Sequence, residues 1–149
     1  MNLISIADLS GEDILRLIQS AEAFRARRGR HGQPLEGKSL AMIFEKPSTR
    51  TRVSLEVAAW ELGGHPLYLS ANELQLGRGE TIADTARVLS RYVHGITARV
   101  HSHGTVLQLA EHASVPVINA LYDWEHPLQI LADLQTIRQN FQALDGLQI

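Results

Sequence analysis

The chain has 149 residues, of which 44% are apolar and 20% charged, as in one soluble globular domain rather than a large multidomain enzyme. Its formal net charge of −2 indicates neither a nucleic-acid-binding face nor a polybasic membrane patch. The chain has no cysteine, which excludes disulfides, thiol nucleophiles and cysteine metal ligands. No apolar run approaches the roughly 18 residues of a membrane span, and no charged-then-apolar leader opens the chain. These features predict a cytoplasmic protein.

The first predicted element is a helix that begins after Ser10. Serine is a favoured N-cap residue, and Asp13 follows three positions later as a capping-box partner. Apolar residues then recur at helical spacing as far as Phe24. The basic cluster at 25–30 is interpreted as a solvated helix end that the helix dipole favours, in preference to an anion or nucleic-acid site.

Beyond residue 39, short apolar runs alternate with helical patterns. The runs have the length and composition of buried parallel strands and cover 40–44, 66–69, 95–100 and 115–120. Helical patterns lie between Pro47 and Gly63 and at 80–92, 105–112 and 127–140. This alternation predicts an α/β domain of three layers, in which a mainly parallel sheet of about four strands carries helices on both faces. Ligands of such sheets lie beyond the carboxyl ends of the strands, near a topological switch point.

The segment after the first strand, 45–52, has the composition of an anion site. It combines hydroxyl groups, a helix N-terminus and arginines, and its central residues are Ser48, Thr49, Arg50 and Thr51. A helix N-terminus favours negative charge, and guanidinium binds phosphate through paired hydrogen bonds. The glycines of a Walker loop are missing. We therefore expect phosphate or carboxylate binding here, with an ordinary capped helix bearing surface arginines as the alternative.

Two further strand exits carry polar side chains. Arg99 falls late in the third strand among small and apolar residues, so it needs either a carboxylate partner or an anionic ligand. After the fourth strand, His126 precedes Pro127 at a helix N-terminus, which lowers a histidine pKa. A neutral imidazole there would donate a hydrogen bond to a carbonyl oxygen, and Gln129 would offer an amide beside it. A capping histidine with no catalytic role is the alternative.

The exits of the first, third and fourth strands should meet at one edge of the sheet. Arg50, Arg99 and His126 would then gather around a small dianion that has an adjacent carbonyl group. His101 and His103 form a His-x-His pair at the predicted strand end, but no third ligand is evident, so no metal site is expected.

Three segments of the chain resemble the aspartate/ornithine transcarbamylase family. Residues 44–52 (FEKPSTRTR) resemble the family's carbamoyl-phosphate signature, and 126–134 (HPLQILADL) are similar to its second signature. Residues 75–91 are similar to the ornithine branch, because the aspartate branch usually has serine and lysine where this chain begins with Gln75. The resemblance implies a carbamoyl-phosphate-binding domain over 1–145, with 146–149 as the start of an absent amino-acid-binding (ornithine) domain.

The resemblance also implies a reaction and roles for individual residues. The δ-amino group of ornithine would attack the carbamoyl carbon to give citrulline and phosphate, without metal or organic cofactor. The implied catalytic residues are Arg50, Thr51, Arg99 and His126. The implied carbamoyl-phosphate ligands are Ser48, Thr49, Arg50 and Thr51 at the phosphate, Arg99, His126 and Thr51 at the carbamoyl oxygen, and Gln129 at its amine. Gln75 would reach the site of a neighbouring subunit in a homotrimer.

One position departs from the family pattern and two alternatives stay open. Leu128 stands where the ornithine branch usually has cysteine. The acceptor could be another amine, such as aspartate, acetylornithine or putrescine, because the residues that select it lie mostly in the absent half. The chain could also be a non-catalytic anion-binding module.

Overall fold

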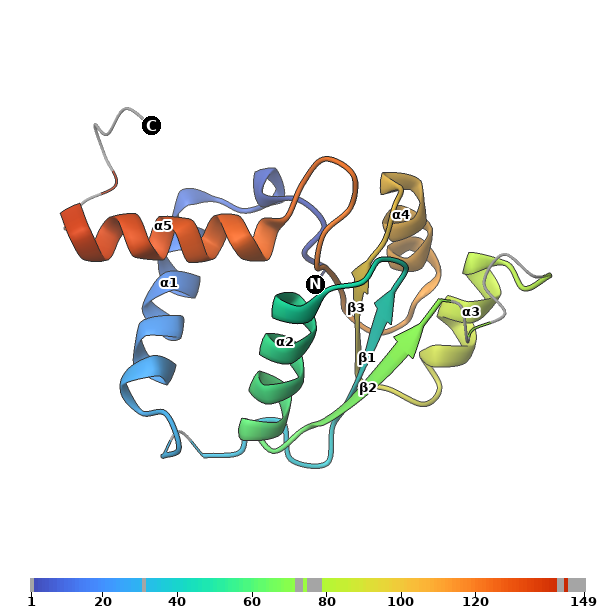
Figure 1. The fold of residues 1–149 in the computed structure, drawn as a ribbon, viewed down its shortest axis with the longest axis horizontal. Helices are drawn as coiled ribbons and strands as arrows, with labels where there is room; N and C mark the ends of the chain where they lie inside the picture. The colour runs from blue at the N-terminus through green and yellow to red at the C-terminus, as the bar shows by residue number, and fades with distance from the viewer. Residues whose placement is uncertain (1, 31, 72–73, 75–78, 142–143, 145–149) are drawn as a thin grey trace.

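The centre of the molecule is a sheet of four parallel strands, hydrogen-bonded in the order β2-β1-β3-β4 (Figure 1). It belongs to a computed structural model that describes residues 2–30, 32–71, 74, 79–141 and 144. The strands are β1 (Ser39–Phe44), β2 (His65–Ser70), β3 (Gly95–Arg99) and β4 (Val117–Asn119). The predicted α/β class and parallel four-stranded sheet are therefore confirmed, with strand boundaries that differ from the predicted ones by one or two residues.

Helices lie on both faces of this sheet and complete three layers (Figure 1). They are α1 (Gly11–Ala26), α2 (Thr49–Glu61), α3 (Ile82–Leu89), α4 (His103–His112) and α5 (Pro127–Phe141), preceded by a 3-10 turn, η1 (Ile6–Asp8). Helix α2 packs on β2, whereas α3 and α4 pack against each other on the opposite face. Right-handed crossovers require this division, because the chain turns back across β1 after β2.

The main hydrophobic core fills the face beneath α3 and α4. Ala41 and Ile43 of β1 are fully buried there against residues such as Leu109 of α4. Met42 and Phe44 alternate with them along the strand and point to the α2 face, since successive strand side chains take opposite sides. Burial on both faces explains why the first strand is an unbroken apolar run.

The predicted start of α1 is confirmed in detail. The Ser10 hydroxyl accepts a hydrogen bond from the backbone N–H of Asp13, and the Asp13 carboxylate accepts one from the backbone N–H of Ser10. The helix packs against α5, where Arg138 pairs with Glu22 at 3.5 Å. These two helices lie beside α2, away from the main core (Figure 1).

Helices α3 and α4 differ from the prediction at their starts. Helix α3 begins two residues later than predicted because Thr81 caps it by accepting from the backbone N–H of Asp84, and it ends at Leu89 rather than at residue 92. Helix α4 begins two residues earlier than predicted because Ser102 caps it by accepting from Gly104. His103 therefore belongs to the first turn of α4, so the predicted His-x-His pair at a strand end was wrong in geometry.

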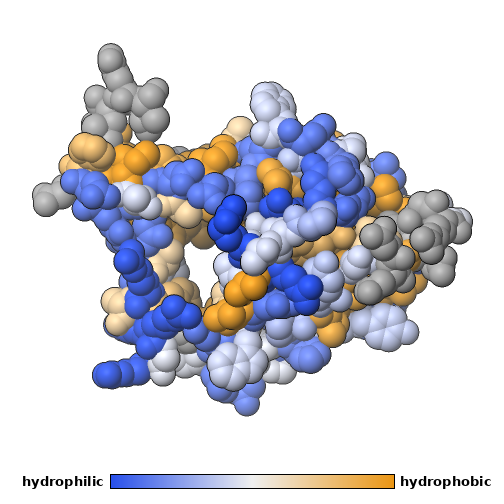
Figure 2. Space-filling view, in the orientation of Figure 1, coloured by the Kyte–Doolittle hydropathy of each residue, from blue (hydrophilic) through white to orange (hydrophobic). Residues whose placement is uncertain are grey.

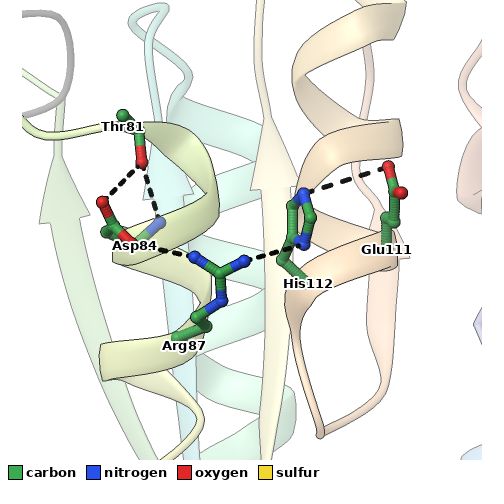
Figure 3. A network of polar contacts seen from close by, with 5 residues as sticks. All are labelled: Thr81, Asp84, Arg87, Glu111 and His112. Carbon is green, nitrogen blue, oxygen red and sulfur yellow. Dashed lines mark hydrogen bonds and ion pairs between the residues drawn. The ribbon is translucent and has the colours of Figure 1, made fainter.

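A polar network on the surface joins α3 to α4 (Figure 3). Arg87 donates to the Asp84 carboxylate at 2.9 Å, and its other terminal nitrogen lies 3.4 Å from Nδ1 of His112. The hydrogen bond from Thr81, with the Arg87 guanidinium as the second cause, lowers the pKa of Asp84. The cap of α3 and its contact with α4 thus share one carboxylate.

The amino-terminal segment extends the sheet beyond β4, which the sequence analysis did not foresee. Leu3 forms a parallel bridge with Ile118, with hydrogen bonds to Val117 at 2.9 Å and from Asn119 at 2.8 Å. A single bridge gives no periodic pattern, so only the tertiary structure reveals it. Gln75 and the predicted domain boundary after residue 145 lie outside the described residues.

Candidate anion-binding site

The topological switch point of the sheet lies between β1 and β3. The chain leaves β1 for β2 on one side and later returns to β3 on the other, so the connections that follow β1 and β3 diverge. Phe44 and Arg99 are register partners at the carboxyl ends of these strands. In parallel α/β sheets ligands bind in a crevice at such a point, and the region at the carboxyl ends of β1 and β3 is called the crevice below.

Arg99 stands at this crevice with hydrogen-bonding capacity left over. Its Nη1 donates to Oγ1 of Thr51 at 3.0 Å, whereas its buried Nε has no partner among the described residues. No carboxylate pairs with this guanidinium within the described part of the chain. Of the two explanations that the sequence left open for Arg99, an anionic ligand is therefore favoured over a structural ion pair.

Glu45 links the exits of β1 and β3. Its backbone N–H donates to the carbonyl of Arg99 at 2.9 Å, and its Oε2 accepts from the backbone N–H of His101 at 2.6 Å. These contacts bind the exit of β1 to the exit of β3, at Arg99 itself and two residues after it. The sequence analysis did not single out Glu45, because a glutamate in a loop is usually a solvated one.

The N-terminus of α2 keeps its donors available. Ser48 is the N-cap residue, but its side chain makes no capping hydrogen bond. The hydroxyl of Ser48 and the first N–H groups of a helix of 13 residues therefore remain open to an anion. Arg52, by contrast, is occupied: it donates to Glu56 at 3.1 Å and lies 3.6 Å from the ring centre of Tyr68.

Arg50 is exposed and has no hydrogen bond or ion pair with any described residue. With Thr49 it borders a cavity of about 640 Å³ on the outer side of α2, together with Val53 and Arg28. Figure 2 shows this hollow between α1, α2 and α5. The structure thus brings Thr51 to Arg99, whereas Thr49 and Arg50 border this separate cavity.

His126 occupies the N-cap position of α5, where its carbonyl accepts from Ile130 at 3.1 Å. Burial, followed by the positive charge of Arg99, lowers the pKa of His126, and Asp133 opposes this shift. The direction agrees with the sequence-based expectation, but burial rather than the helix N-terminus is the main cause. Its Nδ1 is buried without a partner in the described chain, and the lowered pKa favours a neutral imidazole beside Arg99.

Two neighbours of His126 behave differently from what the second signature suggests. The side-chain amide of Gln129 donates to Asp133 at 2.8 Å, so it turns along α5. Leu128 faces away from the crevice and lines a cavity of about 270 Å³ against Leu17 and Ile18 of α1. An apolar residue suits that position, which explains how the chain accommodates leucine where cysteine is usual.

The loop between β4 and α5 is held from within by Asn119. The side chain is fully buried, donates to the carbonyl of Ile4 at 2.8 Å and accepts from the N–H of Leu121 at 2.9 Å. Leu121 has φ of 129°, a region that non-glycine residues rarely occupy. The polar residue inside an apolar strand was the sequence signal for this support, and the sequence analysis did not use it.

No cluster of metal-ligating side chains occurs in the described ranges. Likewise, none of the helices found there is both long and apolar enough to cross a membrane.

The fold and the crevice define a class of protein: a parallel α/β domain with an arginine that has no carboxylate partner among the described residues at the switch point of its sheet. The comparisons agree, since residues 1–139 match the family model described as aspartate/ornithine carbamoyltransferase, carbamoyl-P binding domain. The chain belongs to this family.

Its relatives are about twice as long. An ornithine carbamoyltransferase of Methanosarcina acetivorans is 54% identical over 149 residues, which cover 99% of this chain and 49% of that protein. A relative from Pyrococcus furiosus named an anabolic ornithine carbamoyltransferase is 53% identical and is covered to 48%. The solved ornithine carbamoyltransferase of Pyrococcus furiosus superposes with a TM-score of 0.95 at 54% identity, covering 98% of this chain and 47% of that one. The chain thus spans about half the length of the relatives it matches.

Proposed function

We propose that this chain supplies the carbamoyl-phosphate site of an ornithine carbamoyltransferase, which converts carbamoyl phosphate and ornithine to citrulline and phosphate in arginine biosynthesis. The observation that carries the proposal is the pairing of Arg99 with Thr51 at the switch point, beside an imidazole of lowered pKa. The names of the relatives support ornithine as the acceptor and the biosynthetic direction.

In this proposal the phosphate lies at the start of α2. Its oxygens bind the N–H groups of the first turn and the hydroxyls of Ser48, Thr49 and Thr51. The exposed side chain of Arg50 closes over the phosphate. The helix dipole and the guanidinium both favour a dianion here. The absence of a side-chain cap at Ser48 supports this arrangement, because a hydroxyl engaged in capping would not be free to bind phosphate.

The carbamoyl oxygen lies between Thr51, Arg99 and His126. As the neutral δ-amino group of ornithine attacks the carbamoyl carbon, negative charge grows on this oxygen, and preorganised donors stabilise it. The bond between the carbon and the bridging oxygen then breaks, phosphate leaves with the electron pair, and the amine loses a proton. Gln129 contacts the carbamoyl amine once it turns from Asp133 toward the crevice.

The acceptor and the assembly belong to the whole protein. Ornithine binds through the part of the relatives that this chain does not span, and Gln75 reaches a neighbouring site in a homotrimer. The family resemblance supports both statements. A cytoplasmic location suits the biosynthetic role.

The test is a calorimetric titration with phosphonoacetamide, in which a methylene replaces the bridging oxygen of carbamoyl phosphate. We expect saturable binding that Arg50→Ala weakens by roughly 2–3 kcal/mol, the value of a charge-assisted paired contact. Arg52→Ala is the matched control, since it removes the same charge from the same helix while Arg52 already pairs with Glu56. Equal affinities in all three proteins would contradict the phosphate site. Absence of binding by a sample that sediments as a trimer would contradict it as well.

A further inference from the structure

The amino-terminal segment 2–9 is fastened to the loop that ends at His126. Along β4, Leu3 pairs with the strand, and the carbonyl of Ile4 accepts from the buried amide of Asn119 at 2.8 Å. Past β4, the backbone N–H of Ile6 donates to Oε1 of Glu125 at 2.6 Å. A segment distant in sequence thus reaches the residue directly before His126.

Glu125 contacts the amino-terminal segment through Ile6 and, through Tyr122, is linked to α4. Its second carboxylate oxygen accepts from the hydroxyl of Tyr122 at 3.3 Å, and its carbonyl accepts from the N–H of Tyr122 at 3.2 Å. Tyr122 is buried, and its ring packs on His103 of α4 with the ring centres 4.6 Å apart. Burial, followed by the charge of Glu125, raises the pKa of Tyr122, so its hydroxyl stays protonated as a donor.

We propose that Glu125 is a positioning residue for His126, and that the amino-terminal segment acts through it as a strap that fixes the imidazole beside Arg99. The reason is geometric. The loop contains the strained Leu121, and His126 itself has no hydrogen bond at Nδ1 to hold its ring among the described residues. The ring is therefore positioned through the backbone of the loop. The carbonyl of Glu125 accepts from the Tyr122 N–H and, at 3.4 Å, from the Asn119 amide, and the hydrogen bond from Ile6 to its carboxylate joins this loop to the amino-terminal segment.

This inference deepens the proposed function and rests on it only where ligand binding is concerned. The position of the imidazole has a consequence that needs no ligand, because burial and the charge of Arg99 are what lower its pKa. If the strap is released, His126 gains solvent and its pKa moves up toward 6.5.

The test follows the ring protons of His126 by NMR through a pH titration of the chain, with His126→Gln to assign the signal. Glu125→Ala removes the acceptor, and Ile6→Pro removes the donor. Proline suits this place, because it is the first residue of η1 and Ser5 before it has φ −130° and ψ 151°. Ile6→Ala controls for the lost side chain. Asp123→Ala is the matched control for charge, since this exposed carboxylate lies in the same loop.

We expect Glu125→Ala and Ile6→Pro to raise the pKa of His126 and to weaken phosphonoacetamide binding roughly three- to tenfold, as for one misaligned hydrogen bond. Glu125→Gln should restore both values, because its amide oxygen still accepts from Ile6. Ile6→Ala and Asp123→Ala should leave both unchanged.

An imidazole titration in Glu125→Ala and Ile6→Pro that matches Asp123→Ala would overturn the inference. So would a glutamine variant that behaves like the alanine variant. If wild-type protein that sediments as a trimer fails to bind phosphonoacetamide, the proposed function is contradicted, and the NMR titration still decides the role of Glu125.

Discussion

In the proposed function, Arg99 and His126 have different roles at the crevice because their charges differ. Arg99 keeps a permanent charge and shares one donor with Thr51 at 3.0 Å. Burial and that same charge lower the pKa of His126, which favours a neutral imidazole and, in the proposed function, a donor that adds no second cation. A permanent cation beside a neutral donor suits a carbonyl oxygen that becomes an oxyanion only during the reaction.

These roles predict different losses of affinity for two anions. His126→Ala should weaken the binding of phosphonoacetamide, because the imidazole contacts its amide oxygen in the proposed site. It should leave the binding of inorganic phosphate nearly unchanged. Arg50→Ala should weaken both anions by similar factors, because its partner is the phosphate. Calorimetry with each anion measures the four affinities relative to wild type. Equal losses for both anions in His126→Ala would contradict the assigned roles.

The lowered pKa of His126 also predicts how stability depends on pH. The unfolded chain takes up a proton at this histidine near 6.5, whereas the folded chain resists protonation to a lower pH. Stability from this group is therefore complete above 6.5 and declines as pH falls through the window between the two values. Urea unfolding at pH 8 and pH 5 should show a smaller loss in His126→Asn than in wild type. A larger loss in the variant would contradict the direction of the shift.

At the scale of elements, α1 and α2 both begin at a serine N-cap, but the two serine side chains have different hydrogen bonds. The Ser10 hydroxyl caps α1 by accepting a hydrogen bond from the backbone N–H of Asp13, whereas the side chain of Ser48 makes no capping hydrogen bond. Both serines stand at the N-cap position of a long helix. The first stabilises its helix, and the second leaves the helix end open to a ligand.

Alanine at each cap should separate these roles. Ser10→Ala should lower the free energy of unfolding by about 1 kcal/mol, the usual value of a lost serine cap. Ser48→Ala should change stability by much less, yet weaken phosphonoacetamide binding. Urea unfolding and calorimetry on both variants make the comparison. A Ser48→Ala protein as destabilised as Ser10→Ala, with unchanged affinity, would make Ser48 an ordinary cap.

For the whole molecule, the relevant fact is length. The chain covers about half the length of the relatives it matches, and it folds around one sheet with the crevice at the carboxyl ends of β1 and β3. An enzyme that joins two substrates needs both in one site, since proximity and orientation supply much of the rate. In the proposed function, the described residues supply groups for carbamoyl phosphate and none for ornithine.

The chain by itself should therefore bind phosphonoacetamide but make little or no citrulline. A colorimetric citrulline assay with carbamoyl phosphate and ornithine, run beside the calorimetry, measures both properties on one sample. Steady turnover by the pure chain would show that an ornithine site exists within these 149 residues.

Local patterns in the sequence determined the elements and the chemistry of each strand exit. The unbroken apolar run at 40–44 specified a buried strand, and Ser10 with Asp13 specified a helix start, because both depend on near neighbours. The hydroxyls and Arg50 after the first strand indicated an anion site for the same reason.

Only the tertiary structure decided which of these groups meet. Sequence spacing does not say that Arg99 contacts Thr51, that Glu45 joins two strand exits, or that Ile6 reaches Glu125 across 119 positions. The tertiary structure also placed Leu128 against α1 and turned the side chain of Gln129 toward Asp133. Such contacts arise from strand order and burial, which involve the whole chain at once. Residue types and helix ends follow from local physics, whereas the shape and charge of the crevice follow from packing.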